Sequence, residues 1–373
     1  MRVDEQKLLD LFLQLIRIDN TSLHERAMAD FLIDKFKGWN IDVTEDDAAA
    51  KIGGNAGNLI IRLNSNSNHS SPLVLLAHTD TVRSTAGVKP IIKNGVIRSD
   101  GTTILGADNR SAVALILYVI TEMIEKKLKH RSLEIVFTVA EELGMLGALA
   151  LDFSQLVAKE GYIFDCSAKP GSYVAVSPTA YDFRVQCQGR PAHSAVSPEK
   201  GINAISMALE IMSQFPVGRI NDQTVTNIGT IHGGSADNVV PDQVNFTGEF
   251  RSFSPSEIDR LKTNLENSCR SVSQKYGGKC QVSLKLGFEG YKFDPQMPVI
   301  NRLHRAMQQL NLVPDPMVYS GGSDVNVLNA NGIKAVNVGI GASNPHSNEE
   351  QIALSDLVKG AELLLALVEA EEA

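Results

Sequence analysis

Cysteine, long apolar runs and clustered positive charge are all scarce in this sequence, and each shortage excludes a class of protein. The 373 residues include only four cysteines. They form no CxxC pair, so we expect them to be reduced and buried rather than joined in disulfides. No apolar run approaches the roughly 20 residues that span a bilayer. The formal net charge of −8 argues against nucleic acid as a partner, because phosphate binding needs clustered Lys and Arg.

Several signatures of targeting and catalysis are also missing. The first residues, Met1 to Glu5, lack the basic-then-apolar pattern of a secretory signal, so we expect a cytoplasmic protein that does not engage a membrane. The sequence contains no HExxH, no GxSxG, no Walker loop and no GxGxxG beside a predicted strand. These absences argue against a single-zinc protease, a serine hydrolase, an NTPase and a dinucleotide-binding enzyme.

The length and the patterning predict two domains, one of them of the α/β class. The N-terminal third alternates helical and extended patterns, which is typical of a largely parallel sheet flanked by helices. Ser22 to Glu25 has the spacing of a capping box that opens a helix running to Lys37. A long helix is predicted at 111–127, and short apolar runs predict buried strands at Leu59–Leu63, Leu73–Ala77, Leu133–Val139 and Tyr162–Phe164.

The middle of the chain has a different order, β-α-β-β-α-β, which is that of a ferredoxin-like α+β unit. Its second helix is predicted to start with Ser254 as N-cap and Glu257 closing a capping box. We therefore expect a catalytic domain of residues 1–178 and 290–373, interrupted by an inserted lid or dimerisation domain at 179–289. The predicted elements of the insert are 181–188, 201–214, 223–232, 243–250, 255–275 and 281–286.

Histidines and carboxylates follow the predicted strands at the points where the strands end. The run 73–77 leads into His78 and Asp80, which point the same way in an extended segment, so that one can bind a metal while the other fixes its imidazole. Taken alone, however, this pair is better explained by a surface loop. Asp108 precedes the predicted long helix, where the alternative to a metal ligand is a helix N-cap.

Three further groups complete the pattern. Glu141 and Glu142 follow the run 135–140, Asp165 follows 162–164, and His346 lies in a loop before the last helix. Each of these residues is ordinary by itself, but it is improbable that so many apolar runs end in a His or a carboxylate by chance. His and carboxylate side chains are ligands that suit Zn²⁺, with Co²⁺ or Mn²⁺ as alternatives. An aspartate that bridges two such ions is a recurrent feature of metal-dependent hydrolases.

A series of motifs spans essentially the whole chain: HTDTV (78–82), DGTTILGAD (100–108), AEELG (140–144), Asp165, GRPAHSAVSPEKGINAI (189–205), ADNVVP (236–241), SGGSD (320–324) and His346. In these motifs and their order the chain resembles the cocatalytic-zinc exopeptidases and deacylases, a family that includes peptidase T, carboxypeptidase G, aminoacylase and succinyl-diaminopimelate desuccinylase. The stretch 100–108 is most similar to the peptidase T branch, whereas 192–205 is closer to the deacylases and carboxypeptidases.

The resemblance implies a role for each of the strand-end residues. His78, Asp108 and Asp165 would hold one Zn²⁺, and Asp108, Glu142 and His346 a second. Asp80 would orient His78, and Glu141 would be the general base. The family also implies a cis peptide bond after the bridging Asp108. One departure is present, because Asn109-Arg110-Ser111 replaces the more usual Asp-Lys-Ala or Asp-Lys-Gly.

Four residues outside the metal set are candidates for binding substrate. By resemblance, His193 would reach the active site of a neighbouring subunit and stabilise the oxyanion, in a homodimer formed through the lid. Asn238 lies in the lid as well, and an ordinary loop residue is the alternative for both. Arg251 is a candidate for gripping a substrate carboxylate, with a surface salt bridge as the alternative. Gly322 lies in a glycine-rich turn that offers backbone donors or has no function.

The expected function is that of a peptidase T-like aminopeptidase that releases the N-terminal residue of tripeptides. An N-acyl-amino-acid deacylase or a carboxypeptidase of the same family is the alternative, so the substrate is a short peptide or an acylated amino acid. A noncatalytic metal- or peptide-binding module is the alternative from another class. Glu141 argues against such a module, because a pure binder needs no base.

Overall fold

The computed structural model describes residues 3–67 and 71–369 and divides into two compact units. The first unit comprises Met1–Ala175 and Lys292–Ala373, and the second comprises Val176–Tyr291. Residues 1–2, 68–70 and 370–373 of the predicted catalytic domain lie outside the described residues. The assignment of catalysis to the first unit and of a lid or dimerisation role to the second stays a prediction.

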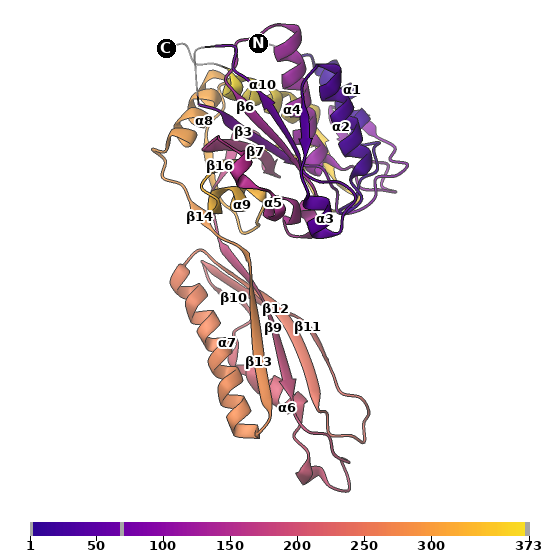
Figure 1. Cartoon of the computed structure of the whole chain (residues 1–373), viewed down its shortest axis with the longest axis vertical. Coiled ribbons are helices and arrows are strands. Elements are labelled where there is room, and N and C mark those ends of the chain that lie inside the picture. Colours follow the sequence, from indigo (N-terminus) through magenta and orange to yellow (C-terminus); the bar gives the residue numbers. More distant parts are fainter. Residues whose placement is uncertain (1–2, 68–70, 370–373) are drawn as a thin grey trace. The chain divides into compact units, whose positions relative to one another are not determined.

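A mixed sheet forms the centre of the first unit, and its middle is parallel as predicted (Figure 1). The four central strands, β6, β3, β7 and β16, run parallel, while β2 pairs antiparallel with β6. Every residue of β3 and β6 is buried, which explains their near-continuous apolar sequences. In spatial order the strands are β1 (Val43–Glu45), β2 (Leu59–Leu63), β6 (Leu133–Thr138), β3 (Leu73–His78), β7 (Glu160–Cys166), β16 (Lys334–Gly339), β8 (Ser172–Ser177) and β14 (Tyr291–Lys292), with β15 (Asp315–Val318) beside β8.

Helices flank this sheet, as predicted. The long α4 (Ala107–Glu125) packs against β3 and β7, and α1 (Glu5–Leu15) and α10 (Leu354–Val368) pack on α4. No helix within the described ranges is both long and apolar enough to cross a membrane. The remaining helices of the unit are α2 (Arg26–Gly38), α3 (Ala48–Ile52), α5 (Leu146–Ala150), α8 (Pro298–Gln309) and α9 (Asp324–Ala330), and a small sheet joins β4 (Ile91–Lys93), β5 (Val96–Arg98) and β17 (Gln351–Ala353).

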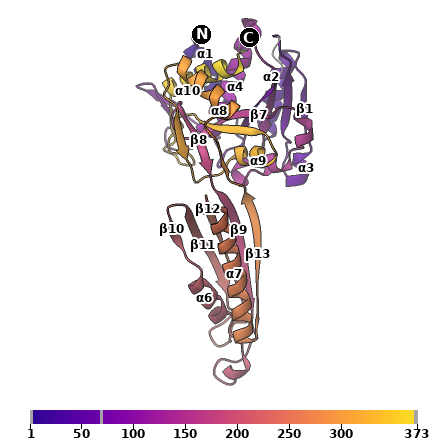
Figure 2. The ribbon, with the colours of Figure 1, turned by 90° about the vertical axis from the view of Figure 1, so that its left-hand side faces the viewer.

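The second unit is a five-stranded antiparallel sheet with two helices against it (Figure 2). Its strand order is β10-β11-β12-β9-β13, and α6 and α7 pack on β9 and β12 over a core of alternating apolar residues. The short edge strand β10 was not predicted. The elements are β9 (Thr179–Gln188), α6 (Ala204–Gln214), β10 (Gly218–Asn221), β11 (Thr224–Gly233), β12 (Gln243–Ser252), α7 (Pro255–Tyr276) and β13 (Lys279–Phe288).

Both predicted capping boxes are wrong, although all four cysteines are free and buried as expected. Helix α2 begins at Arg26, and the Ser22 hydroxyl donates instead to Asp80 at 2.6 Å. Ser254 is the N-cap of α7 but makes no side-chain cap, and Glu257 accepts from Arg260. In each case a side chain with suitable local spacing forms another contact.

Candidate active site

Five predicted metal ligands converge at the carboxyl ends of the parallel strands in the first unit. His78 ends β3, Asp165 lies near the end of β7, and Glu142 lies in the turn that follows β6. Asp108 lies in the first turn of α4, and His346 in the loop after β16. The carboxyl edge of an open α/β sheet is where such folds bind ligands, because the loops there diverge and leave side chains free.

Two trios of ligand atoms meet at Asp108. His78 Nε2 lies 3.2 Å from Asp108 Oδ1 and 3.3 Å from Asp165 Oδ1. His346 Nε2 lies 3.0 Å from Glu142 Oε2 and 3.4 Å from Asp108 Oδ2. Each oxygen of Asp108 therefore faces a different histidine, which is the arrangement that a bridging carboxylate requires.

The separations fit metal ions. A tetrahedral site with metal–ligand bonds of about 2.0 Å has ligand atoms roughly 3.3 Å apart, and the distances within the trios cluster around that value. Glu142 Oε1 is buried and has no hydrogen-bond partner among the described residues, so it is free to bind a cation. The alternative role for Asp108, a helix N-cap, does not apply, because α4 is kinked at Asp108 and Asn109 and the side chain that accepts an N–H of the helix beyond the kink is that of Asn109, from Ala112 at 3.3 Å.

Asp80 contacts both His78 and the turn that carries Glu141 and Glu142. Its Oδ1 lies 3.4 Å from His78 Nδ1, opposite the nitrogen that faces the two aspartates. The same carboxylate accepts the backbone N–H groups of Glu141 at 3.0 Å and Glu142 at 3.2 Å. Asp80 thus orients both the imidazole and the turn that carries the two glutamates, and this second contact was not expected from the sequence.

Glu141 lies beside the ligands, and a third trio joins it with His78 and Glu142. Burial raises the pKa of Glu141 well above its ordinary value, and nearby carboxylates add to the shift. Burial likewise raises the pKa of Asp165 to about 6. The hydrogen bonds to Asp108 and Glu142 raise the pKa of His346 to about 10. So many buried carboxylates in one place favour a cation among them.

Three residues to which the sequence analysis gave no role in the site, Asn109, Asp324 and Glu350, also support it. The Asn109 amide donates to Asp165 Oδ1 at 2.9 Å, and the peptide bond between Asp108 and Asn109 is cis, as the resemblance implies. Asp324 accepts the Thr138 hydroxyl at 2.6 Å, and its other oxygen is buried without a partner in the described part of the chain. Glu350 is buried at the start of α4. Asp324 stands inside a motif quoted above and Asn109 directly beside one, and that proximity was the available signal, whereas Glu350 lies four residues after His346.

His193 and Asn238 belong to the second unit, and the structure brings their segments together. His193 pairs with Val239 in an isolated bridge, and Ser194 N–H donates to the Asn238 carbonyl at 3.0 Å. His193 Nδ1 accepts two backbone N–H groups, at 3.2 and 3.3 Å. In the neutral ring the proton is then on Nε2, which leaves an exposed donor.

The remaining two candidates have ordinary local surroundings. The guanidinium of Arg251 donates to Glu249 at 2.8 Å and lies over the Phe288 ring at 5.6 Å. It would have to exchange Glu249 for a substrate carboxylate, so its binding role stays a prediction. Gly322 lies in the loop before α9, in the same unit as the metal ligands, and its role is likewise untested.

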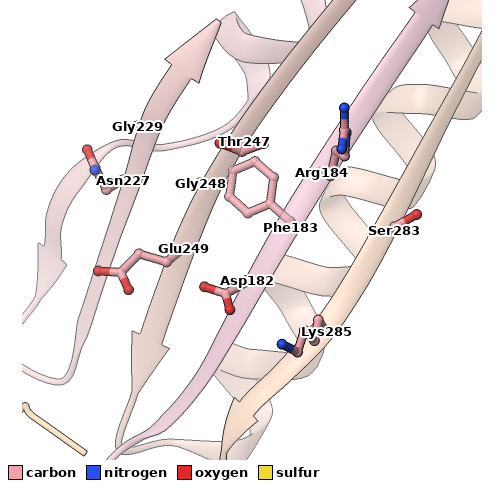
Figure 3. A pocket seen from close by; sticks show the side chains of 10 residues that line it. All are labelled: Asp182, Phe183, Arg184, Asn227, Gly229, Thr247, Gly248, Glu249, Ser283 and Lys285. Atoms are coloured by element: carbon pink, nitrogen blue, oxygen red, sulfur yellow. The ribbon is translucent and has the colours of Figure 1, made fainter. Parts of the chain in front are cut away.

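A hollow of about 460 Å³ on the second unit is distinct from the ligand trios (Figure 3). It lies on the sheet face that carries Asp182 and Arg184, whereas Phe183 between them belongs to the core. Charges of both signs line it, since Asp182 pairs across the strands with Glu249 and Lys285. None of its lining residues belongs to a metal-ligand trio, so we place the chemistry elsewhere.

Comparisons with known proteins match this chain along nearly its whole length. The profile of the peptidase family M20/M25/M40 matches residues 74–370. An uncharacterized protein of Bacillus subtilis, YqjE, is 35% identical in sequence, and the match covers 98% of this chain and 99% of the YqjE chain. The crystal structure of aminopeptidase PepT from Bacillus cereus is 34% identical, with a TM-score of 0.91 and 98% of both chains covered. That of a tripeptidase from Staphylococcus aureus is 33% identical, with a TM-score of 0.93 and 99% of both chains covered.

Proposed function

This chain belongs to the peptidase family M20/M25/M40, and from that membership we propose that it is an aminopeptidase that releases the N-terminal residue of tripeptides at a centre of two Zn²⁺ ions. That it is a peptidase follows from the family and from its relatives. The metal, the tripeptide preference and the roles of individual residues are the proposal. The single observation that carries it is the pair of ligand trios that share Asp108, with Glu141 beside them.

We assign the ligands by the trios. His78, Asp108 and Asp165 would hold one ion, and Asp108, Glu142 and His346 the other. The ligand types suit Zn²⁺, with Co²⁺ or Mn²⁺ as alternatives. When bound, two such ions supply Lewis acidity, which polarises a carbonyl oxygen and lowers the pKa of a water molecule.

Glu141 has the properties of the general base. It is held through its backbone by Asp80, its carboxylate lies with His78 and Glu142, and burial raises its pKa toward the range in which a base works well. It would take a proton from the attacking water and pass it to the departing amine. Asp80 stays ionised throughout and fixes the His78 ring and the Glu141 turn.

We extend the proposal to a homodimer formed through the second unit. His193 of the partner subunit would donate its Nε2 proton to the developing oxyanion, which is consistent with the acceptor contacts of its Nδ1. Arg251 would bind the C-terminal carboxylate of the peptide after releasing Glu249. Asn238 and Gly322 would line the bound peptide.

The names of the two similar solved proteins, an aminopeptidase and a tripeptidase, favour a free N-terminus and a tripeptide as substrate. The second candidate is a deacylase or carboxypeptidase, which the sequence of 192–205 favours. Both candidates use the same metal centre, so the choice depends on which groups of the substrate the enzyme requires.

A substrate panel with product identification tests the proposal. The purified protein, loaded with Zn²⁺, Co²⁺ or Mn²⁺ and analysed for metal content, is given a tripeptide, its N-acetylated form, a dipeptide and an N-acetyl amino acid. We expect two metal ions per chain and release of the N-terminal residue from the free tripeptide alone. Preferred cleavage of the acetylated amino acid, or release of the C-terminal residue, would replace the aminopeptidase by one of the alternatives.

A further inference from the structure

Glu350 is a buried carboxylate that belongs to neither ligand trio. It is 1% exposed, and both of its oxygens are bonded to the backbone at the start of α4. The N–H of Gly106 donates to Oε2 at 2.7 Å, and the N–H of Asp108 donates to Oε1 at 2.8 Å. A buried carboxylate is costly unless it is hydrogen-bonded, so this pair of contacts explains why it is tolerated.

The position of these contacts links Glu350 to the bridging ligand. The first N–H groups of a helix have no partner within the helix, and a nearby Ser, Thr, Asp or Asn usually accepts them. In α4 such a local acceptor is Asn109, whose Oδ1 accepts the Ala112 N–H at 3.3 Å beyond a kink at Asp108 and Asn109. The N–H groups of Gly106 and Asp108 lie before this kink, and they donate to Glu350, which is 244 residues from Gly106 in the sequence. One of the two N–H groups that Glu350 accepts is therefore that of Asp108, the shared ligand.

The other end of the same short segment carries a metal ligand. His346 stands four residues before Glu350, and the Glu350 N–H donates to the Ser347 carbonyl at 3.1 Å, which closes a turn between them. The His346 carbonyl accepts from Arg83 at 2.7 Å. The loop holding His346 is therefore attached at one end by Arg83 and at the other by Glu350, although no strand or helix contains it.

We propose that Glu350 is a positioning residue for the metal centre, which holds Asp108 and His346 at the spacing that one metal ion requires. This inference rests on the proposed two-metal site. Without the Glu350 carboxylate, the backbone of Asp108 loses its acceptor and the His346 loop loses one of its attachments. Asp108 and His346, two of the three ligands in the Asp108–Glu142–His346 trio, are then free to move apart. His78 and Asp165 keep their supports on β3 and β7.

The test compares Glu350→Gln with Glu349→Gln, its exposed neighbour. In Glu350→Gln an NH₂ group replaces one carboxylate oxygen. This NH₂ group cannot accept a hydrogen bond from the backbone N–H that the oxygen accepted, and the two donors repel each other. Groups that orient metal ligands typically change metal affinity by about 10–100-fold. We expect a loss of that size for Zn²⁺, measured by competition with a chromophoric chelator, and a changed visible absorption spectrum of the Co²⁺ form. The loss should be larger at the Asp108–Glu142–His346 position, where two of the three ligands lose a support, than at the position that shares only Asp108 with it. Glu349→Gln should match the wild type in both.

Folding is followed by circular dichroism on the metal-free proteins, so that a stability effect is separated from a positioning effect. Should Glu350→Gln fail to fold, Glu350→Asp keeps the charge but is one methylene too short to reach both N–H groups, and we expect an intermediate loss of affinity. A folded Glu350 variant that binds two ions as tightly as the wild type overturns the inference. Equal losses in the Glu349 variant also overturn it. A wild type that binds no metal overturns the proposed function instead.

Discussion

Replacing Glu141 by Gln separates proton transfer from metal binding. The amide has the shape of the carboxylate but is not basic. Among the residues that the structure describes, no hydrogen bond to the Glu141 carboxylate is formed, and the residue is held through its backbone. Its N–H donates to Asp80, and its carbonyl accepts from Gly144 and Met145. The substitution therefore breaks no contact that supports the fold, and its effect falls on the chemistry.

The expected magnitude follows from the role. Loss of a general base costs about 10²–10⁴-fold in kcat, which is about 2.7–5.4 kcal/mol of activation free energy at about 1.36 kcal/mol per tenfold. Gln also removes a buried charge that the carboxylates of Asp165 and Asp324 repel. The melting temperature of the metal-free variant should therefore be no lower than that of the metal-free wild type.

The adjacent carboxylate provides the matched control. Glu142→Gln removes a predicted ligand, so it should lower the metal content as well as the activity, whereas Glu141→Gln should retain both ions. Metal is measured by elemental analysis after dialysis, and kcat by release of the N-terminal residue from a tripeptide. A Glu141→Gln protein with wild-type kcat would refute the assignment of the base. Loss of metal from both variants would refute the division of roles between the two residues.

Three further substitutions probe the bridge, the lid and the substrate carboxylate. Asp108→Ala should deplete both metal positions together, because each of its oxygens faces a different histidine, and retention of one ion per chain at wild-type affinity in elemental analysis would contradict a bridge. His193→Ala should keep metal but lose most turnover, and subunit exchange with Glu141→Gln should restore activity toward half of wild type per heterodimer. No recovery despite demonstrated exchange would show that His193 does not act across a dimer. Arg251→Met should raise KM for a tripeptide roughly 10-fold or more and leave KM for the tripeptide amide unchanged, whereas equal effects on both would exclude carboxylate binding.

The general plan of the fold could be predicted because it depends on local patterns. Continuous apolar runs gave β2 with its observed bounds and β3 and β6 to within one residue, since strands buried on both faces need no polar alternation. The edge strand β10 was missed because it is short and mostly exposed, so its sequence carries little apolar signal. The capping boxes failed because spacing alone does not reveal a competing partner such as Asp80 for Ser22.

For the candidate site, too, local sequence patterns predicted some features and not others. Residue type and position at strand ends were enough to pick His78, Glu142 and Asp165 as candidates, because parallel strands deliver their carboxyl ends to one edge whatever the loops do. The assignment of these three, with Asp108 and His346, to two metal ions came from the family resemblance. Sequence also supplied the expectation that Asp108 is shared. What it did not supply is which remote group satisfies which backbone N–H.

Only the tertiary structure decided those long-range contacts. Asp80 accepts from the turn at Glu141, and Glu350 accepts from the start of α4, although neither pairing has any signature in local spacing. Arg251 is a contrast, because its partner Glu249 is only two residues away on the same face of β12. The physical reason is that a hydrogen-bond donor is satisfied by whatever acceptor the fold brings within about 3 Å, and chain separation does not enter that requirement. Sequence therefore determined the chemistry that this protein can perform, and the tertiary structure determined how the reacting groups are held.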